Sequence, residues 1–535
     1  MVDAVLKRMR LNISKLTQSA VSQKHNKTQE PYIAAPDISF MDSTRNPITS
    51  GALGDVLEAA SSFSAGDIEY RIVCNAPRPT SVSILHPVVA NATVLVKMET
   101  ESSDLPTQCE FRFSWRVNDL ASDEKLFVPN ATEVGGKIHV TVSNAELPEF
   151  AVEYTCNEPI LPDPGFAPFS LQTKIPEISS GRDIRVGSFN VLAQGYVATD
   201  IAKTIMYPHI HDERILQFSY RNSLILRELL NFSGDLLLLQ EVAPSFVDLC
   251  FKPVLAEAYS GNFVMKANSQ RPNGVAVLAR SSKFRVLEEL QWSLGGDELK
   301  SAFEESEWSS LASQFGSHFD QVVIPNITTV AAVSVLQPLA PEYQNKSVIV
   351  VSTHLFYHPL GGHIRLLQTI ALTRKLQVLI TKYPESSIIL GGDLNSRPER
   401  AAVQFLRSGK IDETDDDWKF GPIFRWNFEN EDDEGTEVVP NGSLAALDDK
   451  TRGISASHDL NLTWSFADDK MPELTHATAS FRAVLDYIFV SQQFHVLDDF
   501  RNLYPTHAAV DAVGGLPCAT YGSDHVLVGA EVQFK

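Results

Sequence analysis

Short, wholly apolar runs recur in the second part of the chain, and they constrain its fold more than any other feature. Leu236–Leu239 is four leucines in a row, and 347–352 and 387–390 carry similar runs rich in Ile, Val and Leu. Such runs are typical of strands that are buried on both faces. Between the last two, apolar residues recur at helical spacing from Ile364 to Leu379. The pattern predicts an α/β fold with buried sheets.

The same part of the chain contains further elements of both kinds. Strands are expected at 184–188, 484–490 and 525–532, and a helix over 213–232, which ends near Ser233-Gly234. Strands and helices therefore alternate from residue 183 to the C-terminal residue.

The sequence suggests four segments. Residues 1–65 are expected to be a basic, unstructured segment and linker, and residues 66–158 a small β-sandwich-like domain, because short alternating strands are separated there by turn residues. Residues 159–182 contain five prolines, which predicts a linker. Residues 183–535 form the α/β domain, in which the acidic, poorly periodic stretch 412–450 is expected to be an insertion loop.

Charge and cysteine content exclude several classes. The 45 Lys and Arg residues against 66 Asp and Glu residues give a net charge of −21, so a basic field over the whole chain is excluded. No basic recognition helix or zinc motif supports readout of duplex DNA. A polyanion must be held locally, for example by a metal ion. Five scattered cysteines without a C-x-x-C pair argue against a disulfide framework and a structural zinc site, and favour a reducing compartment.

The first residues bear on location. Six Lys and Arg residues precede Glu30, Asp3 is the single acid among them, and apolar residues recur at helical spacing between Leu6 and Leu16. This pattern is typical of a targeting helix for the mitochondrial matrix, but a disordered basic tail explains it equally, so the cytoplasm is the alternative. No apolar run approaches the length of a membrane span, and we expect no membrane partner.

Polar residues stand at or near the ends of the predicted strands, where the sites of α/β sheets gather. Several carboxylates that converge there cannot all stay ionised unless they are paired or bind a metal, and sites of Asp, Glu and Asn oxygens select Mg²⁺. The residues concerned are Asn190, Glu241, His354, Asp393, Asn395, Asp486, Asp524 and His525.

Each of these residues also has an ordinary structural explanation. Gly-Asp-x-Asn at 392–395 is commonly a turn, Asp486 could be one awkward charge within a strand, and a lone histidine such as His354 is more often a core residue. The order of the whole set is what favours a functional interpretation.

Six motifs in that order resemble the endonuclease/exonuclease/phosphatase family over about residues 183–535. They are Ser188-Phe-Asn-Val-Leu192, Leu239-Gln-Glu-Val242, Ser352-Thr-His-Leu355, Gly392-Asp-Leu-Asn-Ser396, Leu485-Asp-Tyr-Ile-Phe489 and Ser523-Asp-His525. The segment Thr353–Gln368 resembles the branch of deadenylases, nocturnin and 2′,5′-phosphodiesterases (the last also described as mitochondrial poly(A) deadenylases). The resemblance is weaker before residue 159.

The resemblance implies a four-layer α/β sandwich, preceded by a small all-β domain, that hydrolyses a phosphodiester with one or two Mg²⁺ ions, for which Mn²⁺ can substitute. Glu241 would be the principal metal ligand, and Asp524, Asp393 and Asn395 would complete the metal set.

The same resemblance implies the remaining catalytic roles. Asp393 would deprotonate the attacking water, and Asn190 and Asn395 would bond the scissile phosphate. His525, held by Asp486, would stabilise the developing charge. His354 would lie beside the phosphate or the leaving oxygen.

For the substrate, the resemblance implies that Phe481 stacks on the terminal base and that Pro359 closes its other face, which suits adenine in a single strand. Phe481 could equally be a core aromatic. Arg221, Arg271 and Arg365 are candidates for guiding phosphates, and each could equally be a salt-bridge partner.

The chain departs from the family in places. His476 stands where relatives usually carry Asn, Asn273-Gly274 replaces an acidic residue before Gly, and Val277-Leu278 replaces an aromatic pair. These changes leave base preference and linkage preference open.

We therefore expect a Mg²⁺-dependent exoribonuclease that releases AMP from 2′-5′ oligoadenylate and from the 3′ poly(A) tails of single-stranded RNA. A nocturnin-like 2′-phosphatase on NADPH or a general mRNA deadenylase is the alternative. A non-catalytic scaffold is a further alternative, against which the intact set of motifs argues.

Overall fold

The structure is a computed structural model. It describes residues 38–42, 44–48, 56, 60, 62–65, 68–71, 77–101, 111–178, 181–267, 271–425, 450–466 and 470–535. The chain divides into two compact units, of which the larger comprises 84–97, 126–138 and 156–535 and the smaller comprises 1–83, 98–125 and 139–155.

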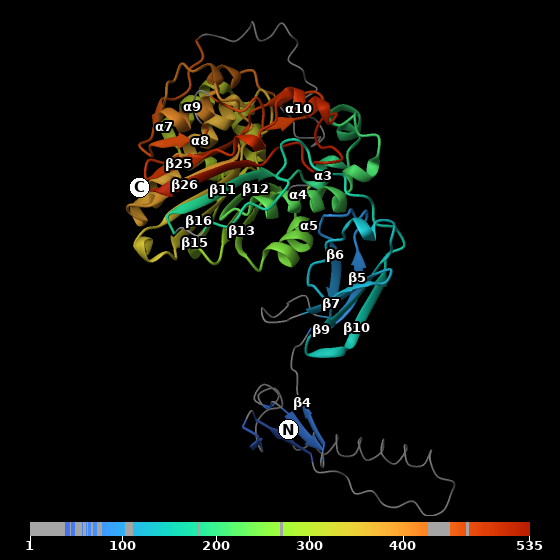
Figure 1. The fold of residues 1–535 in the computed structure, drawn as a ribbon. Helices are drawn as coiled ribbons and strands as arrows, with labels where there is room; N and C mark the ends of the chain where they lie inside the picture. Colours follow the sequence, from blue (N-terminus) through green and yellow to red (C-terminus); the bar gives the residue numbers. More distant parts are fainter. Residues whose placement is uncertain are drawn as a thin grey trace, which may run out of the picture. The chain divides into compact units, whose positions relative to one another are not determined.

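The larger unit is built on two six-stranded sheets (Figure 1). In order, the first sheet contains β13 (Tyr259–Met265), β14 (Gly274–Arg280), β12 (Leu236–Val242), β11 (Asp183–Asn190), β26 (Val528–Phe534) and β25 (Phe494–Asp498). The second contains β15 (Phe284–Ser293), β16 (Val330–Pro338), β17 (Val348–His354), β18 (Ser387–Asp393), β24 (Asp486–Ser491) and β21 (Leu462–Trp464).

The two sheets pack face to face, and helices cover their outer faces. Apolar side chains of both sheets, such as Leu238 and Val350, share one buried cluster. Helix α4 (Phe218–Phe232) packs Ile225 against Leu237 of the first sheet, and α8 (Gly362–Lys382) covers the second. The order helix, sheet, sheet, helix confirms the predicted four-layer α/β sandwich.

The remaining α-helices and strands of the larger unit are short. They are α3 (Gln194–Val197), α5 (Pro244–Phe246), α6 (Gly296–Lys300), α7 (Glu305–Phe315), α9 (Ala401–Ser408), α10 (His507–Ala512) and the paired strands β19 (Lys410–Ile411) with β20 (Ala456–Ser457) and β22 (His476–Ala477) with β23 (Arg482–Ala483). Short 3-10 and π-helical segments, such as Ala202–Met206 and Val247–Leu255, connect them. None of the helices in the described residues combines the length and the apolar composition of a membrane span.

The predicted elements agree closely with those observed. The apolar run at 236–239 extends by three residues to the end of β12, and the predicted helix over 213–232 is a short 3-10 turn, Glu213–Leu216, followed by α4. Helix α4 ends at a left-handed Ser233, whose backbone N–H donates to the Leu229 carbonyl.

The smaller unit is rich in β-strands. One antiparallel sheet has the order β2 (Pro47–Ile48), β1 (Ile38–Met41), β3 (Ser62–Ala65), β4 (Ile68–Arg71), and another has β10 (Leu147–Thr155), β9 (Ile138–Asn144), β7 (Phe111–Val117), β8 (Leu120–Ser122). Strands β5 (Pro79–Ile84) and β6 (Val96–Thr100) pair with each other.

Two segments that we expected to be unstructured contain structure. Within 1–65, strands occur at 38–41, 47–48 and 62–65, because Phe40 and neighbouring apolar residues bury each other. The targeting-helix pattern in residues 1–27 lies outside the described residues.

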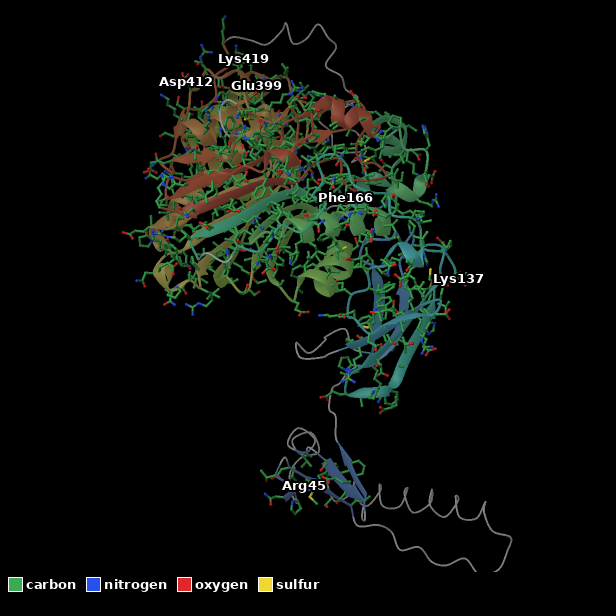
Figure 2. All side chains as sticks on the ribbon, in the orientation of Figure 1. Arg45, Lys137, Phe166, Glu399, Asp412 and Lys419 are labelled. Carbon is green, nitrogen blue, oxygen red and sulfur yellow. The ribbon has the colours of Figure 1, made fainter. Side chains whose placement is uncertain are left out.

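The acidic stretch is folded as far as residue 425. Trp418 in the 3-10 turn Asp416–Phe420 is fully buried, while Asp412 and Lys419 lie with Glu399 at one end of the larger unit (Figure 2). Residues 426–449 lie outside the described residues.

The proline-rich segment 159–182 is part of the larger unit and packs into its core. Ala167, Phe169 and Leu171 are buried in the cluster that contains α4, and Arg227 lies 4.1 Å from the Phe166 ring centroid. The domain boundaries at 158 and 182 stay predictions.

Candidate active site

Strand register brings most of the predicted polar residues to one edge of the two sheets. In the first sheet, parallel β11 and β12 place Asn190 opposite Gln240. In the second, parallel β17 and β18 place His354 opposite Asp393, and antiparallel β24 places Asp486 opposite Asp393 from the other side. Because parallel strands end at the same edge, residues far apart in sequence meet here.

Glu241 owes its position to a β-bulge. Gln240 pairs with Val275 and Val242 with Gly274, so Glu241 is an extra residue in β12. Its φ is +57°, a left-handed conformation that is strained for a non-glycine residue. A bulge redirects a side chain, and strain of this kind is concentrated at functional sites.

The side chain of Asn190 connects the two sheets. Its Nδ2 lies 3.1 Å from Glu241 Oε1, 3.2 Å from Asp393 Oδ2 and 3.4 Å from His525 Nε2. The backbone N–H of Leu192 donates to its Oδ1, which orients the amide. One buried amide therefore contacts three of the predicted catalytic residues.

Two partners hold His525. Its Nδ1 lies 2.9 Å from Asp486 Oδ2, and the Thr475 hydroxyl donates to the same oxygen at 2.7 Å. Burial disfavours the imidazolium, but the carboxylates of Asp486 and Asp393 outweigh burial and raise the pKa of His525. The ring therefore stays protonated and presents Nε2–H to the site.

Asp393 has the environment of a general base. Burial raises the pKa of its carboxyl, His525 opposes the rise, and Asp486 adds to it. Its Oδ2 lies 3.5 Å from His354 Nε2, and its Oδ1 accepts from the Asn395 backbone N–H at 2.8 Å. Burial lowers the pKa of His354 well below its ordinary value, so this imidazole is neutral.

Asn395 follows Asp393 with a left-handed backbone, φ +47°. Its Nδ2 donates to the Leu355 carbonyl at 3.0 Å, which fixes the orientation of the side-chain amide.

Asp524 is held from two sides. The Tyr207 hydroxyl donates to its Oδ2 at 2.7 Å, and His476 Nε2 lies 3.6 Å from the same oxygen. Burial would raise the pKa of Asp524, but the neighbouring His476 and His525 outweigh burial and lower it. The carboxyl is therefore ionised at neutral pH.

The donor set fits a hard divalent cation. The carboxylates of Glu241 and Asp393 share the amide of Asn190, and Asp524 lies near His525, which also contacts that amide. Asp524 Oδ1 and Asp486 Oδ1 are buried without a hydrogen-bond partner. A buried, unpaired carboxylate oxygen is unfavourable unless a cation compensates it. Oxygen ligands of this kind suit Mg²⁺ or Mn²⁺.

The two residues expected to hold the terminal nucleobase of the substrate are both accessible. Phe481 is 41% exposed and Pro359 is exposed, so neither is a core residue. The Phe481 ring lies 5.7 Å from the His476 ring, and the Arg397 guanidinium lies 5.5 Å from its centroid.

Two of the arginines expected to guide phosphates are buried, and we correct their role. Arg221, 0% exposed, donates to the carbonyl oxygens of Leu192 and Gly522, next to motif residues. Arg365 is also buried and donates to three carbonyl oxygens in 356–359. As folded, both arginines position loops, because their terminal NH₂ groups donate to backbone carbonyls, while the Nε–H of each is buried without a hydrogen-bond partner.

Arg271 is half-buried, with its guanidinium 5.8 Å from the centroid of the Tyr196 ring. Its expected role stays a prediction.

Three residues of the site were not among the predictions. Tyr207 and Thr475 bond the carboxylates of Asp524 and Asp486, and the Ser523 hydroxyl donates to the Asn190 carbonyl at 2.7 Å. Ser523 belongs to the motif Ser523-Asp-His525, so the sequence indicates it. Tyr207 belongs to none of the six motifs, and no sequence pattern indicates its role.

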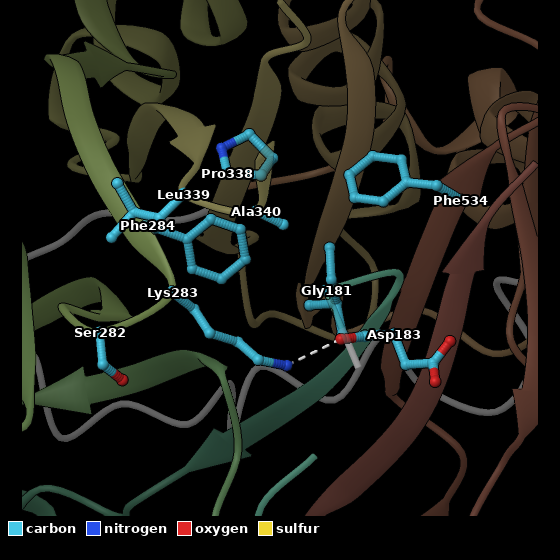
Figure 3. Close-up of a pocket in the computed structure, with 10 residues that line it drawn as sticks. Gly181, Asp183, Ser282, Lys283, Phe284, Pro338, Leu339, Ala340 and Phe534 are labelled. Carbon is cyan, nitrogen blue, oxygen red and sulfur yellow. Dashed lines mark hydrogen bonds between the residues drawn. The ribbon is translucent and has the colours of Figure 1, made fainter. Parts of the chain in front are cut away.

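A cavity of about 260 Å³ lies at the opposite end of β11 (Figure 3). Lys283 in its wall donates to the Asp183 carbonyl and to Asp235, so its charge is already compensated. None of the motif residues lines this cavity.

The fold and the site together define a hydrolase of phosphate esters with an acidic centre between two sheets. The sequence of residues 187–525 matches the family model described as the endonuclease/exonuclease/phosphatase family, and the chain therefore belongs to this family.

Two curated relatives and one solved structure are similar to the chain. The chain is 27% identical to 2′,5′-phosphodiesterase 12 of Rattus norvegicus over 90% of its own length and 77% of that protein. It is 23% identical to a probable CCR4-Not complex 3′-5′-exoribonuclease subunit Ccr4 of Enterocytozoon bieneusi, over 65% and 64% of the two chains. The structure of ANGEL2, a 2′,3′-cyclic phosphatase, in complex with adenosine-2′,3′-vanadate covers 66% of this chain and 96% of its own, with 22% identity and a TM-score of 0.50, and supports the fold.

Proposed function

We propose that the chain is a divalent-metal-dependent exoribonuclease that releases AMP from 2′-5′ oligoadenylate and from 3′ poly(A) tails. The observation that carries the proposal is the network around Asn190, in which one amide contacts Glu241, Asp393 and His525 from both sheets. Likeness to a 2′,5′-phosphodiesterase over 90% of the chain supports the substrate class.

By the family resemblance, Glu241 and Asp524 would hold Mg²⁺, with Asp393 and Asn395 available to a second ion. When bound, the ion would neutralise charge on the scissile phosphate and lower the pKa of a coordinated water. The strained bulge at Glu241 supports this role, because the extra residue brings a carboxylate into reach of Asn190.

The chain's own residues account for proton transfer and charge stabilisation. Asp393 is the base that accepts the proton of the attacking water, since its raised pKa matches that task. The protonated His525, fixed by Asp486, donates to the phosphate oxygen on which charge develops, and Asn190 donates a second hydrogen bond. The neutral His354, whose Nε2 lies 3.5 Å from Asp393 Oδ2, would lie beside the leaving oxygen.

Phe481 and Pro359 would hold the terminal base. Both are exposed, and the face of an exposed aromatic ring stacks on a base at about 1–3 kcal/mol. Stacking tolerates a single strand and requires no base-specific hydrogen bond.

We propose the mitochondrial matrix as the location, on the basic, acid-poor residues 1–27, with the cytoplasm as the alternative.

A gel time course on 2′-5′ triadenylate and on a 3′-5′ RNA that ends in about twenty adenylates tests the proposal. Each substrate is incubated with Mg²⁺ and with EDTA, beside the Glu241→Ala protein. We expect stepwise loss of AMP that both controls abolish, because the metal and its ligand are required. If neither substrate is cleaved but NADPH releases phosphate, the chain is a 2′-phosphatase; if nothing reacts, the scaffold hypothesis replaces the proposal.

A further inference from the structure

His476 lies in the active site, yet the proposed reaction gives it no task. The residue begins β22, is 8% exposed, and its Nδ1 is buried without a hydrogen-bond partner. Its ring centroid lies 4.5 Å from that of His525, and its Nε2 lies 3.6 Å from Asp524 Oδ2. Two imidazoles and one carboxylate therefore meet at a single point.

The backbone fixes this meeting point. His476 and His525 form an antiparallel bridge, in which the Ala477 N–H donates to the Asp524 carbonyl at 2.9 Å and the Val526 N–H donates to the Thr475 carbonyl at 2.8 Å. Because both hydrogen bonds flank the cluster, its side chains start from rigid positions. A site on a rigid frame is preorganised for a ligand.

The spacing is that of a metal site. One ligand atom from each of His476, Asp524 and His525 lies within 4.8 Å of the other two. Ligand atoms about 2.0–2.2 Å from a tetrahedral Zn²⁺ lie roughly 3.4 Å apart, close to the 3.6 Å between His476 and Asp524. The Tyr207 hydroxyl on Asp524 Oδ2 supplies the outer hydrogen bond that orients a ligating carboxylate.

The two imidazoles distinguish this cluster from the magnesium ligands, with which it shares Asp524. Mg²⁺ takes oxygen ligands, whereas imidazole nitrogen favours Zn²⁺ and other borderline transition-metal ions. The other group of three potential ligands in the described residues, Asp393, Asp486 and His525, contains two carboxylates and one imidazole. That group therefore offers one nitrogen donor, whereas the cluster with His476 offers two.

We infer that His476, Asp524 and His525 form a Zn²⁺ site, with water as the fourth ligand, and that zinc bound there inhibits the enzyme. The inhibition follows because Zn²⁺ would displace the Nε2 proton of His525 into solvent, so that Nε2 would be bonded to the metal instead of facing Asn190 and Asp393 as a proton donor. Zinc binding itself does not depend on the proposed substrate.

Equilibrium dialysis of the full chain against Zn²⁺, in excess Mg²⁺ and without substrate, tests the site. We expect one Zn²⁺ per chain, and an affinity at least about tenfold lower in His476→Asn, since loss of an outer ligand contact alone costs that much. His495→Asn is the matched control, because His495 is exposed in β25, and it should bind zinc like the wild type. Thermal unfolding establishes that both variants are folded.

X-ray absorption by zinc in the wild-type protein provides a measurement that needs no variant. The expected spectrum shows two imidazole ligands and oxygen at about 2.0–2.2 Å, without sulfur at about 2.3 Å. The inference is overturned if the wild type binds no zinc in excess Mg²⁺, if sulfur or a single imidazole is found, or if His476→Asn binds zinc as tightly as the wild type.

Discussion

The two sheets contribute to the site in different ways. In the second sheet, His354, Asp393 and Asp486 are opposite one another in three neighbouring strands, so ordinary ladder register sets their positions. In the first sheet, Glu241 is an extra residue with a left-handed backbone, held by hydrogen bonds from Asn190 and from the Ala193 N–H. We call the second-sheet residues, which include the general base Asp393, the base side, and the first-sheet residue Glu241 with its supports the metal side. The base side is built from regular strand pairing, whereas the metal side depends on a strained backbone.

This difference explains why the two sides depend on different supports. A ladder position is secured by the many backbone hydrogen bonds of its sheet, whereas a strained residue persists only where its surroundings over-determine it. Loss of a hydrogen bond to a metal ligand should therefore weaken activity chiefly through the metal side. Loss of a charge should weaken activity chiefly through the base side.

The largest expected effect tests whether both sides are essential. Glu241→Gln and Asp393→Asn should each lower kcat by about 10³-fold or more, because a metal ligand and a general base each supply several kcal/mol of the barrier reduction. Single-turnover release of AMP measures this, with the exposed Glu305→Gln as the control of equal charge change. A decrease in kcat of less than tenfold in either variant would show that its side of the site is not essential.

Asp486→Asn tests the base side through His525. We expect kcat to fall by about 10²-fold with KM nearly unchanged, since the imidazole loses the carboxylate that raises its pKa and orients Nδ1–H. Steady-state kinetics separates the two constants. A rise in KM without a change in kcat would contradict the role of Asp486.

Tyr207→Phe tests the outer support of the metal side. Removal of the hydroxyl from Asp524 should raise the Mg²⁺ concentration needed for half-maximal activity by about tenfold, while the rate at saturating Mg²⁺ changes little. Tyr220→Phe, which removes a hydroxyl that donates to the Ala519 carbonyl, is the matched control. Equal Mg²⁺ requirements in both variants would count against Asp524 as a metal ligand.

The smallest effect on activity is expected outside the site, at Glu228 of α4. Burial raises the pKa of this carboxyl from 4.5 to about 7, so the folded state binds its proton more tightly than the unfolded chain. Its contribution to stability is full below pH 4.5 and is lost as the pH rises to about 7, by roughly 3 kcal/mol. Glu228→Gln should keep its activity and flatten this decline; urea unfolding at pH 5 and pH 8 measures it, and an unchanged decline would contradict the assignment.

The sequence was sufficient to predict the strands that carry the site, because their apolar runs end in polar residues. Asn190, Glu241 and Asp393 stand at such ends, and all three lie in the network. The bulge was not predictable, since register depends on the pairing of β12 with β14 rather than on β12 alone.

Interactions between distant residues were also beyond sequence patterns. The hydrogen bond from Tyr207 to Asp524 joins residues 317 positions apart, and nothing near Tyr207 indicates it. Arg221 was expected either at a phosphate or in a salt bridge; only the fold shows that its terminal NH₂ groups donate to the carbonyl oxygens of Leu192 and Gly522.

The most direct test of the central claim, that two differently built sheet edges act as one catalytic unit, is a double-mutant cycle on AMP release. Asn190→Ala changes the first sheet and Asp486→Asn the second, and both residues contact His525. We predict that the double variant is little slower than the slower single variant, because residues that act as a unit are strongly non-additive. Rate losses that multiply would show that the two edges act independently and would contradict the claim.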